Sequence, residues 1–317
     1  MKKIIDDERV ILRVCDLYYN YDKKQSDIAK ELGISRPTVS RMLSMAKEKG
    51  IVKIIISDLS GRSYFELERK IEEKFDLKCV IIVSKKKDAF EQKDEVGKAT
   101  AEYLTRIVKE GSVVGVSMGT TLTHVSKFID SRIYYRKLMF VPLLGGVGQI
   151  ETELHSNHIA ENLAKKFGGR SMLFHSPAVV SRFETKEALL NEDSIKRVFK
   201  KIENLDIAIV GIGTLHNDST ILKAGYYSEK LLKELKENGA IGDICLRFFD
   251  KYGDSSHMEI NDNVVGVSLN RLKTVPYSIG VACGIEKADS IIGALKGKLV
   301  NVLIIDEECA QEVYRKM

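Results

Sequence analysis

The residues whose types and spacing most clearly suit ligand binding lie in the run GVSMGTT at 115–121, where an apolar stretch is followed by small polar residues. We expect a buried strand over 112–117 that leads directly into a helix, with Ser117, Gly119, Thr120 and Thr121 at the helix start. Backbone N–H groups, two threonine hydroxyls and the helix dipole would converge there, which suits a phosphate group. The alternative is a capped helix start with a closely packed glycine. A Gly-Lys-Ser/Thr sequence is missing from the run, so nucleotide hydrolysis is not expected.

Two other loops follow apolar runs in the same way, one at 145–149 and one at 284–287 after the expected strand 277–284. Gly145, Gly146 and Gln149 belong to a glycine-rich loop after the expected strand 138–144, where a ligand could approach the backbone closely. In open α/β sheets, ligands bind outside the carboxyl ends of the strands. The sequence therefore predicts that these residues contribute to a binding site.

Two charged residues complete the set of candidates. Lys287 lies near the start of an expected helix over 286–295, where the dipole disfavours a cation, so an anion is a plausible partner. Asp243 begins the apolar run DICLRFF and could accept hydrogen bonds from sugar hydroxyls. The alternatives are an exposed surface lysine and an acidic turn residue.

The sequence gives little indication of a metal site or of a catalytic nucleophile. His155 and His158 stand three residues apart on an expected helix, but two histidines without a third ligand more often cap or pack than bind a metal. No Ser/His/Asp arrangement can be assembled from the spacing. We therefore expect no metal site, no catalytic residue and no cofactor.

A second kind of chemistry is indicated near the N-terminus, where 25–49 reads as two short helices joined by a turn. Gly33 can adopt the left-handed turn, Ser35 is a good N-cap, and Pro37 is tolerated in the first turn of the second helix. Apolar residues at helical spacing form one stripe of that helix. This is the pattern of a helix-turn-helix, whose second helix enters the major groove of DNA.

The charge distribution supports that interpretation. Between residues 33 and 56 there are five Lys or Arg and one acidic residue, whereas a solvated helix face usually mixes the signs. We expect the second helix to face the groove, with the first helix at the DNA backbone. The predicted DNA-binding residues are Gln25, Ser26, Ser35, Arg36, Thr38, Ser40 and Arg41.

Length and composition bound the architecture. The chain has 317 residues, 44% hydrophobic and 30% charged, with a net charge of +5, as expected for a globular protein of about two domains. The five scattered cysteines argue against a disulfide framework, and no run is long enough to span a bilayer, so we expect a cytoplasmic protein. We place a DNA-binding domain at 1–58 and a second domain at 59–317.

The two domains differ in pattern. A helix over 6–20 should support the helix-turn-helix, and the β-branched run 51–57 suggests a wing strand. From residue 64 onward, apolar strands alternate with helices, which favours a largely parallel sheet covered on both faces. The expected strands are 79–83, 112–117, 138–144, 171–174, 205–213, 243–249, 277–284 and 301–308.

Several long motifs, in order along nearly the whole chain, resemble the SorC family of sugar-binding bacterial transcription regulators. They are QSDIAKELGISRPTVSRML, GVSMGTT, LLGGVG, AIVGIG, IGDICLRFFDKYGD and KADSIIGALKGKLVNVLIIDE. The resemblance implies an N-terminal helix-turn-helix and an α/β effector domain similar to the ribose-5-phosphate isomerase, glucosamine-6-phosphate deaminase and CoA-transferase fold, without catalysis. It also implies a dimer or tetramer that binds operator DNA and a phosphorylated sugar.

The resemblance assigns roles to individual residues. The family's phosphate loop corresponds to Gly119, Thr120 and Thr121, its phosphate-binding lysine to Lys287, and its hydroxyl-binding acid to Asp243. Its double glycine corresponds to Gly145 and Gly146. In the deoxyribonucleoside regulators a lysine just before that pair forms a Schiff base with the sugar, whereas this chain has Leu144 there. A non-covalent phosphorylated sugar is therefore the expected effector.

The expected function is a DNA-binding regulator of a carbohydrate or nucleoside operon, whose effector releases or tightens its hold on DNA. The alternative is a sugar-phosphate isomerase or deaminase fused to a DNA-binding domain. Such an enzyme needs a positioned general base, and Asp243 is the one plausible candidate, with no partner acid evident.

Overall fold

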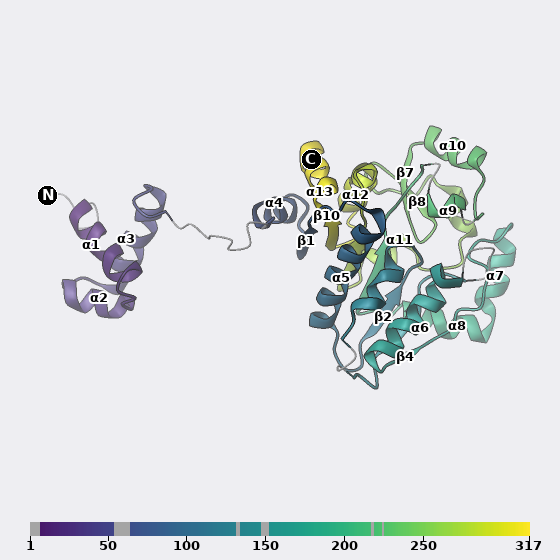
Figure 1. Ribbon diagram of the computed structural model, residues 1–317, viewed down its shortest axis with the longest axis horizontal. Helices are drawn as coiled ribbons and strands as arrows, with labels where there is room; N and C mark the ends of the chain where they lie inside the picture. The colour runs from purple at the N-terminus through teal and green to yellow at the C-terminus, as the bar shows by residue number, and fades with distance from the viewer. Residues whose placement is uncertain (1–6, 54–63, 131–133, 147–151, 217–218, 224) are drawn as a thin grey trace. The chain divides into compact units, whose positions relative to one another are not determined.

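The computed structural model describes residues 7–53, 64–130, 134–146, 152–216, 219–223 and 225–317. Its contacts divide the chain into two compact units, residues 1–61 and 62–317 (Figure 1). The boundary predicted between residues 58 and 59 falls outside the described residues.

The smaller unit consists of three helices, α1 (Glu8–Tyr19), α2 (Gln25–Leu32) and α3 (Arg36–Glu48). Gly33 ends α2 with φ 65°, and its N–H bonds back to the carbonyls of Ala29 and Lys30. Ser35 caps α3, because its side chain accepts a hydrogen bond from the N–H of Thr38. The predicted helix-turn-helix is confirmed, and its core is formed by the fully buried Ile11, Val14, Ile28, Val39, Met42 and Ala46.

The region after α3 differs in part from the prediction. Ile51 and Val52 lie in a bend and pack against the three-helix core, and the Val52 N–H bonds to the carbonyl of Ala46. The remainder of the predicted wing strand, 54–57, lies outside the described residues.

The larger unit is organised around a seven-stranded parallel sheet in the order β1-β10-β9-β5-β2-β3-β4. Its strands are β1 (Cys79–Val83), β2 (Val113–Val116), β3 (Met139–Pro142), β4 (Arg170–Ser171), β5 (Ile207–Gly211), β9 (Tyr277–Val281) and β10 (Val302–Asp306). The expected parallel sheet is thus confirmed, although β4 is shorter than the predicted 171–174.

Helices cover both faces of this sheet, as its strands' continuous apolar character requires. One face packs against α5 (Ala89–Ile107), the 3-10 helix η2 (Leu122–Phe128) and α6 (Ser156–Phe167). The other packs against α4 (Phe65–Phe75), α8 (Asp193–Ile202), α12 (Ala288–Lys296) and α13 (Glu307–Lys316). Ile207 and Ile209 face the first layer and Ala208 and Val210 the second, which is the alternation expected of a strand.

A three-stranded sheet lies beside the parallel one and consists of β6 (Gly213–Thr214), β7 (Ala240–Ile244) and β8 (Arg247–Asp250). The single strand predicted over 243–249 is wrong, because the chain reverses between β7 and β8. The two turn residues, Cys245 and Leu246, have φ of 54° and 60°, a conformation that β-hairpin turns require but that side chains disfavour.

The remaining elements surround these sheets. They are η3 (Thr152–Leu154), α7 (Phe183–Asn191), α9 (Thr220–Lys223), α10 (Glu229–Glu237), η4 (Glu259–Asn263), α11 (Leu269–Lys273) and η5 (Ile285–Lys287). Helices α7 and α8 were not predicted, and the helix predicted after the 115–121 run is the short 3-10 helix η2. None of the helices in the described ranges combines the length and apolarity that crossing a membrane requires.

Candidate functional site

The predicted DNA-reading residues lie on an exposed surface of the smaller unit. Arg36, Ser40 and Arg41 are exposed on α3, while Thr38 is half-buried. The hydroxyls of Thr38 and Ser35 lie 2.8 Å apart, so both take part in capping the helix. Arg41 Nε reaches back to the Pro37 carbonyl at 3.4 Å, a weak contact that leaves the guanidinium available to a partner.

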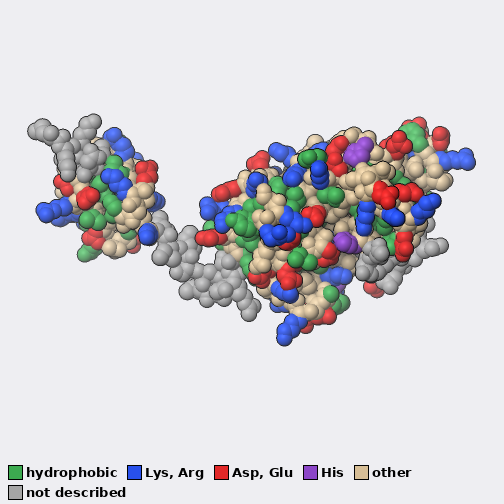
Figure 2. Space-filling model, turned by 90° about the horizontal axis from the view of Figure 1, so that it is seen from above, with side chains coloured by type: hydrophobic (Ala, Val, Ile, Leu, Met, Phe, Trp, Pro, Cys, Tyr) green, Lys and Arg blue, Asp and Glu red, His purple; other side chains and the backbone are tan. Residues whose placement is uncertain are grey.

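A shallow groove joins the two helices of the motif. Gln25 and Ser26 from α2 line it together with Arg36 from α3 and the cations Lys23 and Lys24. Lys23 is paired with Glu31 at 2.5 Å. Figure 2 shows Lys and Arg side chains at several points on the surface of this unit. The groove lining also includes Asp22 and two tyrosines, but its three cations outnumber the one acid, which suits a phosphate backbone.

The larger unit contains a cavity of about 220 Å³ at the carboxyl ends of β2, β5 and β9. The direction of strand addition reverses here. Strand β3, the next strand after β2 in the chain, lies on one side of β2, whereas β5 lies on the other side. Such switch points are where open α/β sheets bind ligands. The cavity is smaller than the roughly 300–1,000 Å³ of drug-sized sites, so its size suits a small metabolite.

The predicted phosphate loop forms one wall of this cavity, which Ser117, Gly119, Thr120 and Thr121 all line. Gly119 has φ 145°, a region that glycine alone adopts readily. Within the described part of the chain, the N–H groups of Thr120 and Thr121 donate no hydrogen bond to the backbone, so they remain available to a ligand. Because η2 is short, an anion bound here would contact these amides and hydroxyls rather than a long helix dipole.

Two lysines from different elements lie at the same cavity. Lys287 is held on η5 by a turn that Asp306 fixes, since the Asp306 carboxylate accepts the N–H of Gly284 at 2.6 Å. Lys93 reaches the cavity from α5. Burial raises the pKa of the Cys283 thiol, and both lysines oppose that shift, so both ammonium groups act on the same wall. Glu286 and Asp243 line the cavity as well, so its charged groups are two lysines and two carboxylates, and the lysines are the groups that suit an anion.

Asp243 lies deep in the cavity wall and is only 5% exposed. Its Oδ1 has no hydrogen-bond partner, and a Cβ at the facing Gly213 would overlap that oxygen. Burial raises the pKa of this carboxyl to about 6, against the opposing charge of Lys287 and the N–H of Leu246. An unpaired buried carboxylate oxygen is costly unless a ligand hydroxyl completes it.

The double-glycine loop is not part of this lining. A Cβ at Gly145 would come within 2.6 Å of the carbonyl oxygens of Ser176 and Pro177, and one at Gly146 within 2.8 Å of the Asn157 amide. Both glycines thus allow close packing at the end of β3. Leu144 is fully buried, and Gln149 lies outside the described residues, so the roles of Gly145, Gly146 and Gln149 in binding stay predictions.

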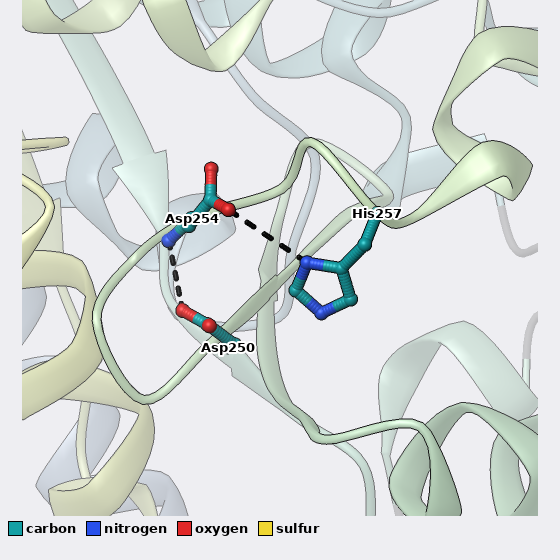
Figure 3. A group of neighbouring side chains, drawn as sticks. All are labelled: Asp250, Asp254 and His257. Atoms are coloured by element: carbon teal, nitrogen blue, oxygen red, sulfur yellow. Dashed lines mark hydrogen bonds and ion pairs between the residues drawn. The ribbon is translucent and has the colours of Figure 1, made fainter.

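Within the described ranges, one group of three potential metal ligands has its ligand atoms within 4.8 Å of one another: Asp250, Asp254 and His257 (Figure 3). Asp250 Oδ1 accepts the N–H groups of Tyr252 and Asp254, and Asp254 accepts the N–H and hydroxyl of Ser256. These bonds close the loop after β8 and account for the cluster. His155, by contrast, is buried at the N-cap of α6.

Sequence reasoning left four polar residues of the cavity out of the predicted site, namely Lys93, Thr214, Ser219 and Glu286. Lys93 lies in the first turns of a helix, the position that singled out Lys287, so the same argument would have found it. Ser219 precedes the short helix α9 and carries no local signal, because only the fold brings it to the strand ends.

Comparisons with known proteins agree with this arrangement. Residues 62–315 match the family model of a sugar-binding domain, and residues 17–53 match that of a winged helix-turn-helix DNA-binding domain. The deoxyribonucleoside regulator of Bacillus subtilis is 34% identical over 96% of both chains. The sorbitol operon regulator of Klebsiella pneumoniae is 32% identical, covering 96% of this chain and 98% of the relative.

A solved structure covers both units. The full-length sorbitol operon regulator SorC from Klebsiella pneumoniae superposes with a TM-score of 0.75 at 31% identity, over 96% of this chain and 98% of SorC. These relatives are transcriptional regulators rather than enzymes, which removes the support for a catalytic role. With a DNA-binding helix-turn-helix, a sugar-binding domain and these relatives along nearly its whole length, the chain belongs to the SorC family of sugar-binding transcriptional regulators.

Proposed function

We propose that this regulator controls a carbohydrate or nucleoside catabolic operon in the cytoplasm, and that a phosphorylated sugar bound non-covalently sets its affinity for double-stranded operator DNA. The cavity of the larger unit carries the proposal, because free amides and two lysines face it beside an unpaired carboxylate oxygen. The anionic end of the ligand would bind Thr120, Thr121, Lys287 and Lys93, and its hydroxyls would bind Asp243. No cofactor is needed for this switch.

Self-association belongs to the proposal. Helix-turn-helix proteins read two half-sites whose symmetry mirrors that of the protein, so a dimer is the smallest expected assembly. A tetramer is the form that the family resemblance implies. Effector binding would then shift the balance between assemblies with different half-site spacing.

A thermal-shift screen of the full chain against pentose and hexose phosphates, beside their unphosphorylated parents, tests the effector class. A ligand at one hundred times its Kd stabilises the native state by about 2.7 kcal/mol, which a melting curve resolves easily. We expect a shift with one or more phosphorylated members and none with their parents. Equal shifts with both forms would contradict the phosphate site.

Lys287→Ala is expected to weaken binding of the phosphorylated sugar about ten- to one-hundred-fold, since a charged hydrogen bond contributes about 1.5–3 kcal/mol. Isothermal titration of the full chain with the best ligand of the screen measures this. Lys296→Ala is the matched control, because Lys296 is exposed on α12 and does not line the cavity. Unchanged affinity in Lys287→Ala would remove this lysine from the site.

Arg41→Ala is expected to weaken operator binding about five- to one-hundred-fold, because an arginine that reads a base edge contributes about 1–3 kcal/mol. Fluorescence anisotropy with a DNA duplex selected by the full chain from a random library measures the change. Arg13→Ala removes the same charge from an exposed position on α1. Equal losses of operator affinity in the two variants would mean that Arg41 contributes only its positive charge and does not recognise a base.

A further inference from the structure

The effector cavity holds a second polar atom without a partner. In the described part of the chain, three buried side-chain atoms lack a hydrogen-bond partner: Ser219 Oγ, Asp243 Oδ1 and Tyr226 OH. Ser219 and Asp243 both line the one cavity of about 220 Å³. Because folded proteins rarely leave such atoms unpaired, two of them in one cavity indicate that its occupant supplies the partners.

Ser219 is placed as a ligand-facing residue rather than a structural one. Its side chain is 6% exposed, and its backbone is satisfied, since its N–H bonds to the carbonyl of His216 and its own carbonyl accepts from Leu222. Only the hydroxyl remains unpaired. A structural serine would instead use its hydroxyl within the protein, as Ser278 of β9 does toward the Leu299 carbonyl at 2.9 Å.

We propose that Ser219 is a specificity-determining residue of the effector site, which binds a second polar group of the sugar while Asp243 binds a hydroxyl. The inference rests on the proposed function and narrows it. An ionised carboxylate only accepts hydrogen bonds, whereas a serine hydroxyl can donate or accept. The effector must therefore carry, besides its phosphate, at least one free hydroxyl for Asp243 and a second hydroxyl or carbonyl oxygen for Ser219.

The test compares Ser219→Ala with Ser278→Ala in the full chain. Without ligand, Ser219→Ala should melt at the wild-type temperature or above it, because it deletes an unpaired buried hydroxyl. Ser278→Ala should melt lower, because it leaves the Leu299 carbonyl without its donor. A lower melting temperature in Ser219→Ala, similar to that of Ser278→Ala, would show an internal partner and overturn the proposal whatever the ligand.

The binding arm uses ribose 5-phosphate and glucose 6-phosphate beside their 2-deoxy analogues. Ser219→Ala should weaken ribose 5-phosphate or glucose 6-phosphate, whichever the wild type binds, about three- to ten-fold, the value of one neutral hydrogen bond, while Ser278→Ala keeps wild-type affinity. If Ser219 contacts the 2-hydroxyl, the wild-type preference over the deoxy probe disappears in Ser219→Ala. If it contacts another group, both probes weaken equally.

The melting and binding experiments distinguish a failure of the role proposed for Ser219 from a failure of the proposed function. Wild-type affinity in Ser219→Ala for a probe that needs Lys287 would overturn the role of Ser219 and leave the phosphate site standing. Failure of every phosphorylated sugar to bind the wild-type chain would count against the proposed function, whereas the melting comparison would still decide whether the Ser219 hydroxyl has an internal partner.

Discussion

Replacing Asp243 with Asn is expected to make the ligand-free protein more stable at pH 7.5 while it weakens effector binding. The buried carboxyl has its pKa raised to about 6, whereas an unfolded aspartate titrates near 3.9. Ionising it in the folded state at neutral pH therefore costs about 3 kcal/mol. Asn has the same shape without the charge, so we expect a gain of about 1–3 kcal/mol, because its buried amide still lacks a full set of partners.

The pH dependence of this effect has a definite sign. Between pH 4 and 6 the folded chain retains a proton that the unfolded chain releases. The protonated Asp243 carboxyl makes its full contribution to the free energy of unfolding below about pH 4, and this contribution is lost as pH rises through about 6. Melting curves of wild type and Asp243→Asn should thus converge toward pH 4 and separate above pH 6.

Effector affinity should change in the opposite sense. Ligand hydroxyls donate to the ionised carboxylate, so wild-type affinity should rise with pH through about 6. The phosphate group of the ligand also titrates near pH 6, so its part of the pH dependence of the affinity remains in Asp243→Asn. We expect the variant to bind at least about ten-fold more weakly and with a shallower pH profile.

Asp306→Asn is the contrasting control for Asp243→Asn. Asp306 is equally buried, but its carboxylate accepts the N–H groups of Gly284 and Cys309, so an amide there loses an acceptor and the protein should become less stable. A loss of stability in both variants would mean that Asp243 is a structural residue.

Arg247→Leu is expected to destabilise the larger unit by about 3–5 kcal/mol, because each buried carbonyl left without a donor costs about 1–3 kcal/mol. The Arg247 side chain is 8% exposed. Its guanidinium donates four hydrogen bonds of 2.6–3.2 Å to the carbonyls of Val267, Asn261, Val264 and Gly266. Its removal leaves the carbonyls of Val267, Val264 and Gly266 without their donor, whereas the Asn261 carbonyl still accepts the N–H of Val264.

The same guanidinium holds the tight turn at the cavity. Arg247 directly follows Cys245 and Leu246, both with positive φ, a conformation that costs about 1–3 kcal/mol each and needs support from its surroundings. Urea unfolding monitored by circular dichroism measures the expected loss. Arg315→Ala, which breaks an exposed pair with Glu312, should change stability by less than about 1 kcal/mol. Equal effects in the two variants would contradict the structural role of Arg247.

The sequence predicted the convergence of the site because parallel strands bring their carboxyl ends to one edge. On that rule, residues as distant in the chain as Thr120, Asp243 and Lys287 were expected together, and all three line the cavity. The helix-turn-helix could also be predicted from the sequence, because the glycine turn, serine cap and apolar stripe are local signals.

Other features depend on long-range contacts and carry no local signal. The apolar residues Cys245 and Leu246 favour a strand, yet the chain reverses there because Arg247 fixes the turn from carbonyls up to 20 residues away. Ser219 becomes a cavity residue only through the packing of the segment around α9. Gly145 packs closely against the Ser176 and Pro177 carbonyls, a contact that the local sequence does not indicate, and its role in ligand binding stays a prediction.

The central claim is that a phosphorylated sugar in the larger unit controls DNA binding by the smaller one. The most direct test measures the affinity of the full chain for its selected duplex with and without the best phosphorylated sugar of the screen. We predict that this ligand changes operator affinity at least about ten-fold and that its unphosphorylated parent does not. Lys287→Ala should bind DNA normally but need about ten- to one-hundred-fold more ligand to respond. An operator affinity that stays the same at saturating ligand would contradict the account.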